Sequence, residues 1–353
     1  MKILILPGDG IGAEITAVTR MALEVLDRKF GLGLDIVERD VGMASIEKGL
    51  DPMPDGVMEE VRATPFTILG PVSTMEYPPD AQGFPSPSLA IRDGLDLYAN
   101  IRPSKTRPGV PSMAREMDLV IVRENTEGFY AARTMHEGKG EFMPSPDIAM
   151  SLRKISVKGS RRIARTAFDL ARTRRKKVTV VHKGNVLRVT DGLFLREVRD
   201  VARDYPDVET EEIIVDAMAA LLIRRPESFD VVVTTNMFGD ILSDEAAELA
   251  GGLGLGGSIN ASGDHAVAQA AHGSAPDIAG RNMANPTAHV MSAQMLLKWH
   301  ADRSGNNQLA SAAAHLEAAV DNVLADPANH TADLGGSTGT REFGDLLAAS
   351  VDQ

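Results

Sequence analysis

The sequence predicts an α/β protein in which buried strands alternate with helices. Near the N-terminus, Lys2–Leu6 is typical of a buried strand, and a glycine turn and a helical pattern to about Leu26 follow it. Further along, the β-branched run Val231–Thr235 is typical of a strand buried on both faces, and a helical pattern follows from Asp240. No linker, repeat or low-complexity tract divides the chain, so two domains would have to share the sheet or interleave.

Composition excludes several classes of function. The chain has 353 residues, of which 43% are hydrophobic and 24% charged, as in globular proteins generally. The net charge of −12 argues against a nucleic-acid partner, so any anion site must be a local cluster of arginines. Because cysteine is absent, disulfides, thiolate nucleophiles and zinc–cysteine sites are excluded. The N-terminal apolar run is too short for a signal peptide and no run approaches a membrane span, which predicts a cytoplasmic protein without a membrane partner.

The first part of the chain continues a βαβ progression. Leu34–Arg39 and Phe66–Gly70 are strand-like, with a helical stretch between them. The proline-rich segment Ser73–Ser88 has few apolar residues and is typical of a functional loop. The turn Pro7–Gly12 is placed like the phosphate-binding turn of a dinucleotide-binding fold, but its GxGxG spacing is not that of the fingerprint.

Three arginines predict an anion site. Arg92 lies in a helical stretch, Arg102 ends the strand-like run Leu97–Ile101, and Arg123 closes the strand Asp118–Arg123. Buried guanidinium groups need partners, and arginine binds carboxylates through two parallel hydrogen bonds. Together the three predict a site for a multiply charged carboxylate. The alternative is that each arginine pairs with a nearby acid.

The middle of the chain predicts an arm and a basic helix. Asp147–Val157 alternates in polarity after a polar segment that ends at about Pro146, which predicts an arm or strand ribbon reaching another subunit. The chain from Arg153 to Lys177 is strongly basic. Its apolar residues follow helical spacing, which favours an amphipathic helix with a solvated basic face over a nucleic-acid site.

Charged residues follow several predicted strands. Asp240 and Asp244 are four apart in a predicted helix after a break at Asn236–Gly239, so both carboxylates lie on one face. Two such hard oxygen donors suit Mg²⁺ or Mn²⁺, and Asp216, at the end of another strand, is available as a third. The alternative is that acids in a first helical turn complement the helix dipole. Lys183 also ends a strand, where a lowered pKa would let it act as a base.

Seven motifs together resemble the β-decarboxylating dehydrogenases, which include isocitrate, homoisocitrate, isopropylmalate and tartrate/malate dehydrogenases. They occur in family order from Pro7 to Gly336 and read PGDGIG, LYANIRP, VRENTEGFY, HKGN, TTNMFGDILSD, HGSAPDIAG and ADLGG. The resemblance implies an isopropylmalate dehydrogenase-like α/β fold, not a Rossmann fold, with two domains sharing a large mixed sheet. It assigns 1–98 and 249–353 to a large domain with the cofactor loop, and 99–248 to a small domain with the dimerisation arm and catalytic residues.

The resemblance also implies a cofactor site, most of it in the loop His272–Gly280. The implied residues are Ile11, Asn236, His272, Gly273, Ser274, Ala275, Asp277, Asn285 and Asp333. Family members that use NAD carry an acid after the loop's Ala-Pro, where NADP users carry a basic residue. Because the carboxylate of Asp277 can accept from a ribose 2′-hydroxyl but would repel a 2′-phosphate, NAD is the predicted coenzyme.

By the same resemblance, the reaction is oxidation of a 2-hydroxy acid at C2 and loss of the carboxylate on C3, with Mg²⁺ or Mn²⁺ bound. Asp240 and Asp244 would hold the metal together with Asp216 from a second copy of the chain. Lys183, also from the second copy, would assist removal of the hydroxyl proton, and Tyr130 would protonate the enolate carbon. The implied substrate-binding arginines are Arg92, Arg102 and Arg123. A site shared in this way predicts a homodimer as the active unit.

The substrate's C3 substituent is predicted from Ser86 and Ser88, which stand where isopropylmalate enzymes place a glutamate and leucines. Hydroxyls suit a polar substituent, because burial against methyl groups would leave them unpaired. The motifs ENTEGFY, in place of ELTGGIY, and HKGNVLRVTDGLFL also favour the isocitrate/homoisocitrate branch. Tartrate or malate comes next, and isopropylmalate third.

The sequence departs from the family pattern at one place, and a second class of function is an alternative to an enzyme. The family usually has Glu-Pro-Val before the loop's histidine, whereas this chain has Gln269-Ala270-Ala271, a change beside the expected nicotinamide site. The rival of another class is a non-catalytic regulatory subunit that binds NAD. The presence of the lysine, the tyrosine, the three aspartates and the three arginines favours an enzyme.

Overall fold

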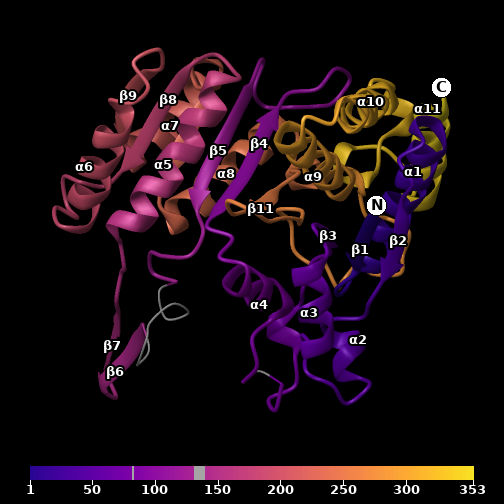
Figure 1. Ribbon diagram of the computed structural model, residues 1–353, viewed down its shortest axis with the longest axis horizontal. Coiled ribbons are helices and arrows are strands. Elements are labelled where there is room, and N and C mark those ends of the chain that lie inside the picture. Colours follow the sequence, from indigo (N-terminus) through magenta and orange to yellow (C-terminus); the bar gives the residue numbers. More distant parts are fainter. Residues whose placement is uncertain (82, 131–139) are drawn as a thin grey trace.

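The computed structural model describes residues 1–81, 83–130 and 140–353, and its centre is a ten-stranded mixed sheet (Figure 1). Across the sheet the order is β2-β1-β3-β12-β11-β4-β5-β10-β8-β9. The strands are β1 (Lys2–Leu6), β2 (Asp35–Glu38), β3 (Phe66–Leu69), β4 (Ala99–Lys105), β5 (Asp118–Glu124), β8 (Lys177–His182), β9 (Glu209–Ile214), β10 (Val231–Thr234), β11 (Ile259–Ala261) and β12 (Ala266–Ala268). A separate ribbon pairs β6 (Glu141–Ser145) with β7 (Ile148–Ser151).

The sheet joins two parallel halves through an antiparallel centre. β2, β1, β3 and β12 are parallel neighbours at one end, and β5, β10, β8 and β9 are parallel neighbours at the other. Between them, β11 runs antiparallel to both β12 and β4, and β4 runs antiparallel to β5. This arrangement is not the doubly wound Rossmann order. The predicted α/β class with a large mixed sheet is therefore confirmed.

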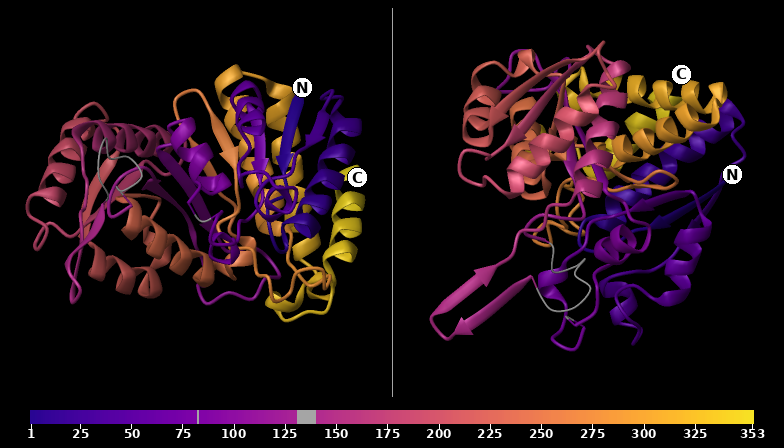
Figure 2. Two further views of the ribbon diagram at one scale, coloured as in Figure 1. Left: turned by 90° about the horizontal axis from the view of Figure 1, so that it is seen from below. Right: turned by 60° about the vertical axis from the view of Figure 1, so that its left-hand side comes forward.

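Helices cover both faces of the sheet (Figures 1 and 2). They are α1 (Gly12–Phe30), α2 (Met43–Ile46), α3 (Asp55–Ala63), α4 (Pro87–Gly94), α5 (Val157–Arg172), α6 (Thr190–Ala202), α7 (Val215–Arg224), α8 (Asn236–Ala250), α9 (Thr287–Ser304), α10 (Asn307–Leu324) and α11 (Thr340–Asp352). In β5, Val120 and Val122 pack in the core under α5 and α6, whereas Leu119 and Ile121 pack in the core under α7 and α8. Successive strand residues point to opposite faces, so a strand covered on both sides is apolar throughout.

The hydrophobic cores group distant parts of the chain. One core joins β1 and α1 to α9, α10 and α11, so both ends of the chain share it. Two others are built almost entirely from β4, β5, β8, β10 and α5 to α8. The cores agree with a large domain of 1–98 and 249–353 and a small domain of 99–248, and that division stays a prediction.

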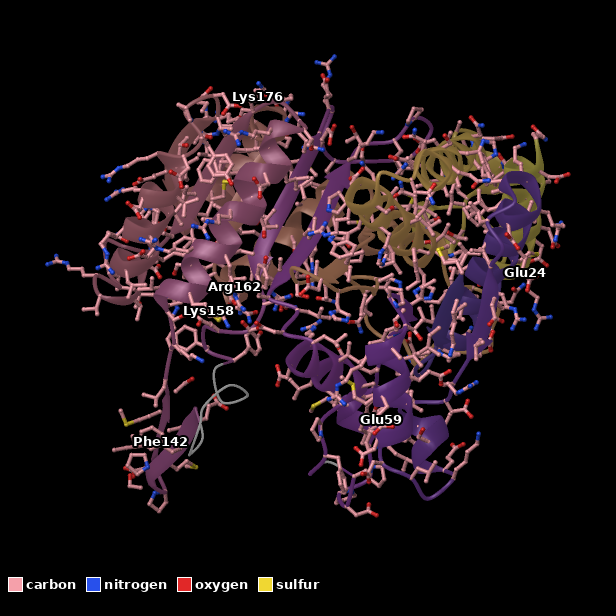
Figure 3. All side chains as sticks on the ribbon, viewed as in Figure 1. Glu24, Glu59, Phe142, Lys158, Arg162 and Lys176 are labelled. Atoms are coloured by element: carbon pink, nitrogen blue, oxygen red, sulfur yellow. The ribbon has the colours of Figure 1, made fainter. Side chains whose placement is uncertain are left out.

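The ribbon of β6 and β7 extends away from the rest of the molecule (Figure 2). Four apolar side chains expose much of their surface on this ribbon: Phe142 (Figure 3), Met143, Ile148 and Met150. The sequence predicted an arm at 147–157, and the ribbon contains part of that stretch. Its other strand comes from the segment interpreted as polar, of which residues 131–139 lie outside the described residues.

Two local predictions were wrong. The segment Asn236–Gly239 is not a break but the first turn of α8, which begins directly after Thr235 in extended conformation. Asp216 does not end a strand, since it lies in the first turn of α7. The basic stretch is α5, whose buried face includes Ile163 and Ala167 as expected. Among the described residues, no helix is long and apolar enough to cross a bilayer.

Candidate active site

Two arginines and two aspartates meet where β4, β5 and α8 come together. Arg102 lies on β4, Arg123 on the neighbouring β5, and Asp240 and Asp244 are one turn apart on α8. Arg102 Nη1 donates to Asp244 Oδ1 at 2.9 Å, and its Nη2 is 3.3 Å from Asp240 Oδ1. Arg123 Nη1 donates to Asp240 Oδ1 at 2.6 Å. We call these four residues the acid–arginine cluster.

The cluster brings predicted metal ligands and predicted substrate arginines into one balanced set of charges. The alternative that each arginine pairs with a local acid holds for Arg102 and Arg123, and the local acids are the predicted metal ligands. Burial, followed by the charge of Arg102, lowers the pKa of Arg123 to about 10. Burial raises the pKa of Asp244, against the lowering effect of Arg102. A cation and a substrate carboxylate could each replace one partner of these ion pairs.

Two asparagines orient the arginines. Asn100 Oδ1 accepts from Arg102 Nε at 2.6 Å. Asn236 Oδ1 accepts from Arg123 Nε and Nη2 at 3.0 and 2.7 Å, and its Nδ2 donates to the Glu127 carbonyl at 3.0 Å. The structure therefore gives Asn236 a positioning role, and its predicted contact with the cofactor stays a prediction. Sequence reasoning missed Asn100, although an asparagine inside an otherwise apolar strand was a signal.

Tyr130 and Arg92 are half-buried. The charge of Tyr130 is among those that raise the pKa of Arg123, so the tyrosine is within electrostatic reach of the cluster. Arg92 lies in the last turn of α4, an element separate from those that carry the cluster. Their predicted contacts with substrate stay predictions.

Lys183 and Asp216 form a second, exposed pair. Lys183 Nζ donates to Asp216 Oδ1 at 2.5 Å, across the gap between the end of β8 and the start of α7. The hydrogen bond from Lys183 is the main reason why the pKa of Asp216 is lowered. Within residues 1–81, 83–130 and 140–353, no three His, Cys, Asp or Glu side chains are grouped to hold a metal ion. One chain therefore does not bring Asp216 to Asp240 and Asp244.

Ser86 and Ser88 have different surroundings. Ser86 Oγ caps α4 by accepting from the Leu89 amide at 3.3 Å, which leaves its own hydrogen available. Ser88 is buried, and its hydroxyl donates to Gln269 Oε1 at 3.0 Å. Asn260 Nδ2 also approaches Gln269 Oε1, at 3.5 Å. Ser88 can therefore accept a hydrogen bond from a ligand, but its hydrogen is already engaged. Sequence reasoning flagged Gln269 without predicting this partner.

The predicted cofactor loop packs on the N-terminal glycine turn. Ile11 N donates to the Ser274 carbonyl at 2.8 Å, and a Cβ on Gly10 would lie 2.0 Å from that oxygen. Glycine is thus required at this turn because the loop backbone approaches it so closely. On the other side, Asn285 Nδ2 donates to Asp333 Oδ2 at 3.0 Å. These contacts pair Ile11 with Ser274 and Asn285 with Asp333, and the predicted contacts of all four with the cofactor stay predictions.

Buried polar atoms without partners surround this loop. Among the described residues, His272 Nε2, Thr287 Oγ1 and His289 Nδ1 are buried and accept or donate no hydrogen bond. Burial lowers the pKa of His272, and it lowers that of His289 to about 3. Buried polar atoms of this kind are normally satisfied by water or ligand. His289 was missed, because a lone histidine in an apolar helix carries no recognisable signal.

Comparison with known proteins gives concordant results. A family model described as Isocitrate/isopropylmalate dehydrogenase matches residues 2–347. The chain is 42% identical to an isocitrate/homoisocitrate dehydrogenase of Thermus thermophilus, over 99% of this chain and 98% of that one. It is 40% identical to a 3-isopropylmalate dehydrogenase of Methanothermobacter thermautotrophicus, over 100% and 99%. The crystal structure of isocitrate dehydrogenase from Methylococcus capsulatus superposes with a TM-score of 0.88 at 40% identity, covering 100% and 99%.

The fold, the acid–arginine cluster and these matches define an oxidatively decarboxylating dehydrogenase of 3-substituted malates. The chain belongs to the isocitrate/isopropylmalate dehydrogenase family. That family generally uses NAD or NADP and a divalent metal ion.

Proposed function

We propose that the protein is an NAD-dependent, divalent-metal-dependent dehydrogenase that oxidises and decarboxylates isocitrate or homoisocitrate. The acid–arginine cluster is the observation that carries the proposal. It holds two carboxylates for a cation beside two guanidinium groups for a polycarboxylate, in a protein whose overall charge is strongly negative. A binding protein for NAD alone would not need this arrangement.

The donor set fits Mg²⁺ or Mn²⁺ if a second copy of the chain contributes. Asp240 and Asp244 are hard oxygen donors on one helix face, and Mg²⁺ is commonly held by one or two carboxylates together with water and substrate oxygens. Asp216 is the third donor in this proposal, and it must come from another copy. When bound, the ion would neutralise the charge that develops on the substrate's oxygens, and NAD would accept the hydride.

Exposed apolar side chains beside these residues support a homodimer. Ile241, between the two metal-site aspartates, is 60% exposed, and Val189, six residues after Lys183, is 83% exposed. Val186 and Ile223 are also exposed, and the ribbon of β6 and β7 adds further apolar surface. Exposed apolar side chains that lie together are typical of interaction sites, and the proposed dimer would cover these. A second copy that covered them would also bring Lys183 and Asp216 to the cluster.

The chain's own residues have separate roles in substrate binding and proton transfer in this proposal. Arg102 and Arg123 hold substrate carboxylates, and Arg92 is proposed as the third arginine of this clamp. Lys183 takes part in removing the proton from the substrate's C2 hydroxyl. Tyr130 donates a proton to C3 after the carboxylate has left. Its place within electrostatic reach of Arg123 supports that role.

NAD is preferred because of Asp277, whose side chain lies in an exposed part of the loop. A carboxylate there accepts from a ribose 2′-hydroxyl and repels a 2′-phosphate. His272 Nε2, which is buried without a hydrogen-bond partner, supports binding of the adenine base beside it. The remaining loop residues, Gly273 and Ala275, would contact the cofactor through their backbone, and Ala275 has a positive φ of 39°.

The serines of α4 support a polar substituent on C3. The free hydrogen of Ser86 can be donated to a carboxylate, which isocitrate and homoisocitrate carry at this position and isopropylmalate lacks. Relatives named isocitrate/homoisocitrate dehydrogenase and 3-isopropylmalate dehydrogenase are almost equally similar, so residue chemistry decides the order. Tartrate or malate is the second candidate.

The test is reduction of NAD with isocitrate, homoisocitrate, isopropylmalate, tartrate and malate, with Mn²⁺ present. The proposal expects the highest kcat/KM for one of the two tricarboxylates. A preference for isopropylmalate would refute the substrate assignment and leave the reaction class intact. Binding of NAD without turnover of any of the five would favour the regulatory subunit instead.

A further inference from the structure

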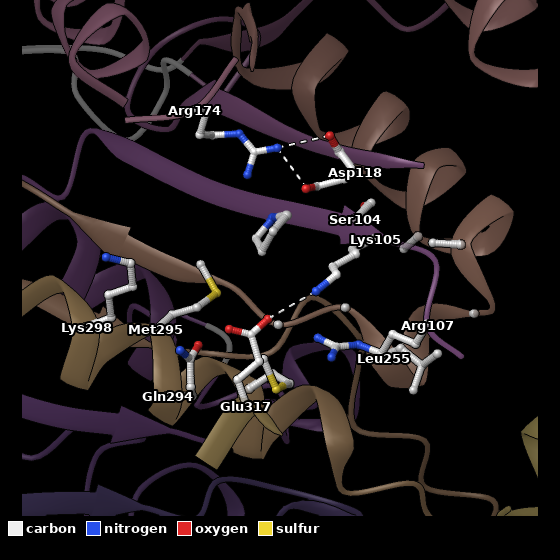
Figure 4. A pocket seen from close by; sticks show the side chains of 17 residues that line it. Ser104, Lys105, Arg107, Asp118, Arg174, Leu255, Gln294, Met295, Lys298 and Glu317 are labelled. Carbon is white, nitrogen blue, oxygen red and sulfur yellow. Dashed lines mark hydrogen bonds and ion pairs between the residues drawn. The ribbon is translucent and has the colours of Figure 1, made fainter. Parts of the chain in front are cut away.

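A cavity of 240 Å³ lies at the far end of β4 from the acid–arginine cluster (Figure 4). Its walls come from the end of β4, the start of β5, the C-terminal half of α8, and from α9 and α10. The cavity shares no lining residue with the cluster. Pockets for drug-sized ligands measure roughly 300–1,000 Å³, so this one suits a smaller metabolite.

Two buried polar side chains line the cavity without partners. Gln294 on α9 is only 4% exposed and Ser104 on β4 only 6%, and neither side chain hydrogen-bonds to any part of the chain that the structure describes. In Figure 4, the amide of Gln294 lies between Lys298 and Glu317. The polar atoms of neither side chain are fully cut off from solvent, so they open into the cavity, where water or a ligand can hydrogen-bond to them. These groups therefore point to an occupant that hydrogen-bonds.

The charges of the cavity leave two lysines available. Arg174 donates to Asp118 at 2.7 Å, and this pair is closed. Lys105 Nζ forms long ion pairs with Glu317 at 3.7 Å and with Asp321 at 4.0 Å, and both distances are too long for a hydrogen bond. Lys298 pairs at 2.8 Å with Asp302, one turn along the same exposed helix face. Exposed i,i+4 pairs are weak, so a ligand carboxylate can replace Asp302 as the partner.

Part of the wall between the two lysines is apolar, beside the amide of Gln294 and the carboxylate of Glu317. Figure 4 shows Met295 between Lys298 and Lys105, and Met291 and Leu255 also line the cavity. Methionine side chains adapt to aliphatic surfaces of different shape. Inorganic phosphate has no apolar surface that could pack against these side chains. An aliphatic chain with a carboxylate at each end matches both the lysines and the surface between them.

We propose that this cavity is a second ligand site, separate from the catalytic one, for a small aliphatic dicarboxylate. One carboxylate contacts Lys105 and the other Lys298. The methylene groups lie on Met295, and Gln294 donates a hydrogen bond from its amide.

The experiment is isothermal titration calorimetry of the whole protein with succinate, glutarate and adipate, beside butyrate and inorganic phosphate. At least one dicarboxylate should bind more tightly than butyrate and phosphate. Lys105→Gln and Gln294→Leu should each weaken that binding about tenfold, the loss of one charged or buried contact. Lys48→Gln, at an exposed lysine of the α2 region, is the matched control and should leave it unchanged.

Three results would overturn the proposal. Butyrate or phosphate could bind as tightly as every dicarboxylate, which would deny the need for two charged ends. Both cavity variants could bind like the unaltered protein. Alternatively, Arg123→Gln could abolish the binding while Lys105→Gln retains it, which would place the dicarboxylate in the acid–arginine cluster. None of these readouts depends on turnover, so failure here is distinguishable from failure of the proposed activity.

Discussion

Asp244 and Asp216 are residues of the same type in opposite settings. Asp244 is half-buried in the acid–arginine cluster, where ion pairs connect two arginines and two aspartates. Burial raises its pKa. Asp216 is exposed, has Lys183 as its charged partner, and its pKa is lowered. The first setting is complete within one chain. The pair of Asp216 and Lys183 is open to solvent, and exposed apolar residues lie near it in the sequence.

In the proposed dimer, this difference separates residues that stabilise the fold of one chain from residues that act in the active site of the other. Removing a charge from the acid–arginine cluster leaves another charge without its partner in a buried place, which costs stability as well as activity. Removing a charge from the exposed pair changes only what that residue does chemically. Activity and stability measured together therefore tell the two regions apart.

Asp240→Asn is expected to have the largest effect. Turnover should fall roughly a hundredfold or more, and Mn²⁺ affinity should fall with it, because one anionic ligand is lost. The free energy of unfolding should fall by roughly 1–2 kcal/mol, less than for a fully buried pair because Asp240 is partly exposed. Steady-state kinetics over a range of Mn²⁺ and urea unfolding measure the two. Unchanged activity at limiting Mn²⁺ would remove Asp240 from the metal site.

Lys183→Gln should reduce turnover by about 10²–10⁴-fold, the usual contribution of proton transfer. The free energy of unfolding should hardly change, since the pair with Asp216 is exposed. Kinetics and urea unfolding are again the measurements, with Lys158→Gln, at another exposed lysine, as the matched control. A loss of stability like that of Asp240→Asn would contradict the distinction between the two regions.

Asp277→Lys extends the comparison to an exposed residue that is proposed to contact the cofactor. Removing a carboxylate and adding an ammonium group should shift the ratio of kcat/KM for NAD over NADP by about tenfold or more toward NADP. The control is Asp264→Lys, the same change at another acid. An unaltered ratio in Asp277→Lys would show that the ribose is held elsewhere.

The smallest effect is a difference in titration between Asp244 and Asp216. The pKa of Asp244 is raised on folding, so its contribution to stability is present at low pH and is lost as pH rises through the folded pKa. The pKa of Asp216 is lowered, so its contribution is present above the unfolded pKa and is lost as pH falls through the folded one. NMR titration of the carboxyl carbons in metal-free protein should show Asp244 protonating first as pH falls. The reverse order would refute the assigned environments.

Sequence pattern predicted most of the fold because strands buried on both faces are apolar throughout. Val231–Thr234 and Lys2–Leu6 were recognisable for this reason. The start of α8 was missed, since Asn236 and Gly239 favour turns in isolation. In the structure Asn236 is held by Arg123, which is 113 residues away in sequence. Local propensity contains no information about such a contact.

The site was predictable in its residue types and less so in its partners. The spacing of Asp240 and Asp244 placed them on one helix face, and the motif resemblance predicted that they bind the metal. The engagement of Ser88 by Gln269 spans 181 residues and could not be predicted from spacing. Gln294 and Lys105 gave no signal either, because the sequence pattern does not show which side chains line a cavity.

The claim that the active site is built from two chains is tested most directly by mixing two inactive variants. Lys183→Gln and Asp240→Asn proteins are unfolded together, refolded, and assayed for NAD reduction. If Lys183 serves the cluster of the other chain, each hybrid dimer has one intact site, and about one quarter of full activity should return on random pairing. If both residues serve the same chain, every site stays defective, and a mixture that remains as inactive as its components would contradict the account.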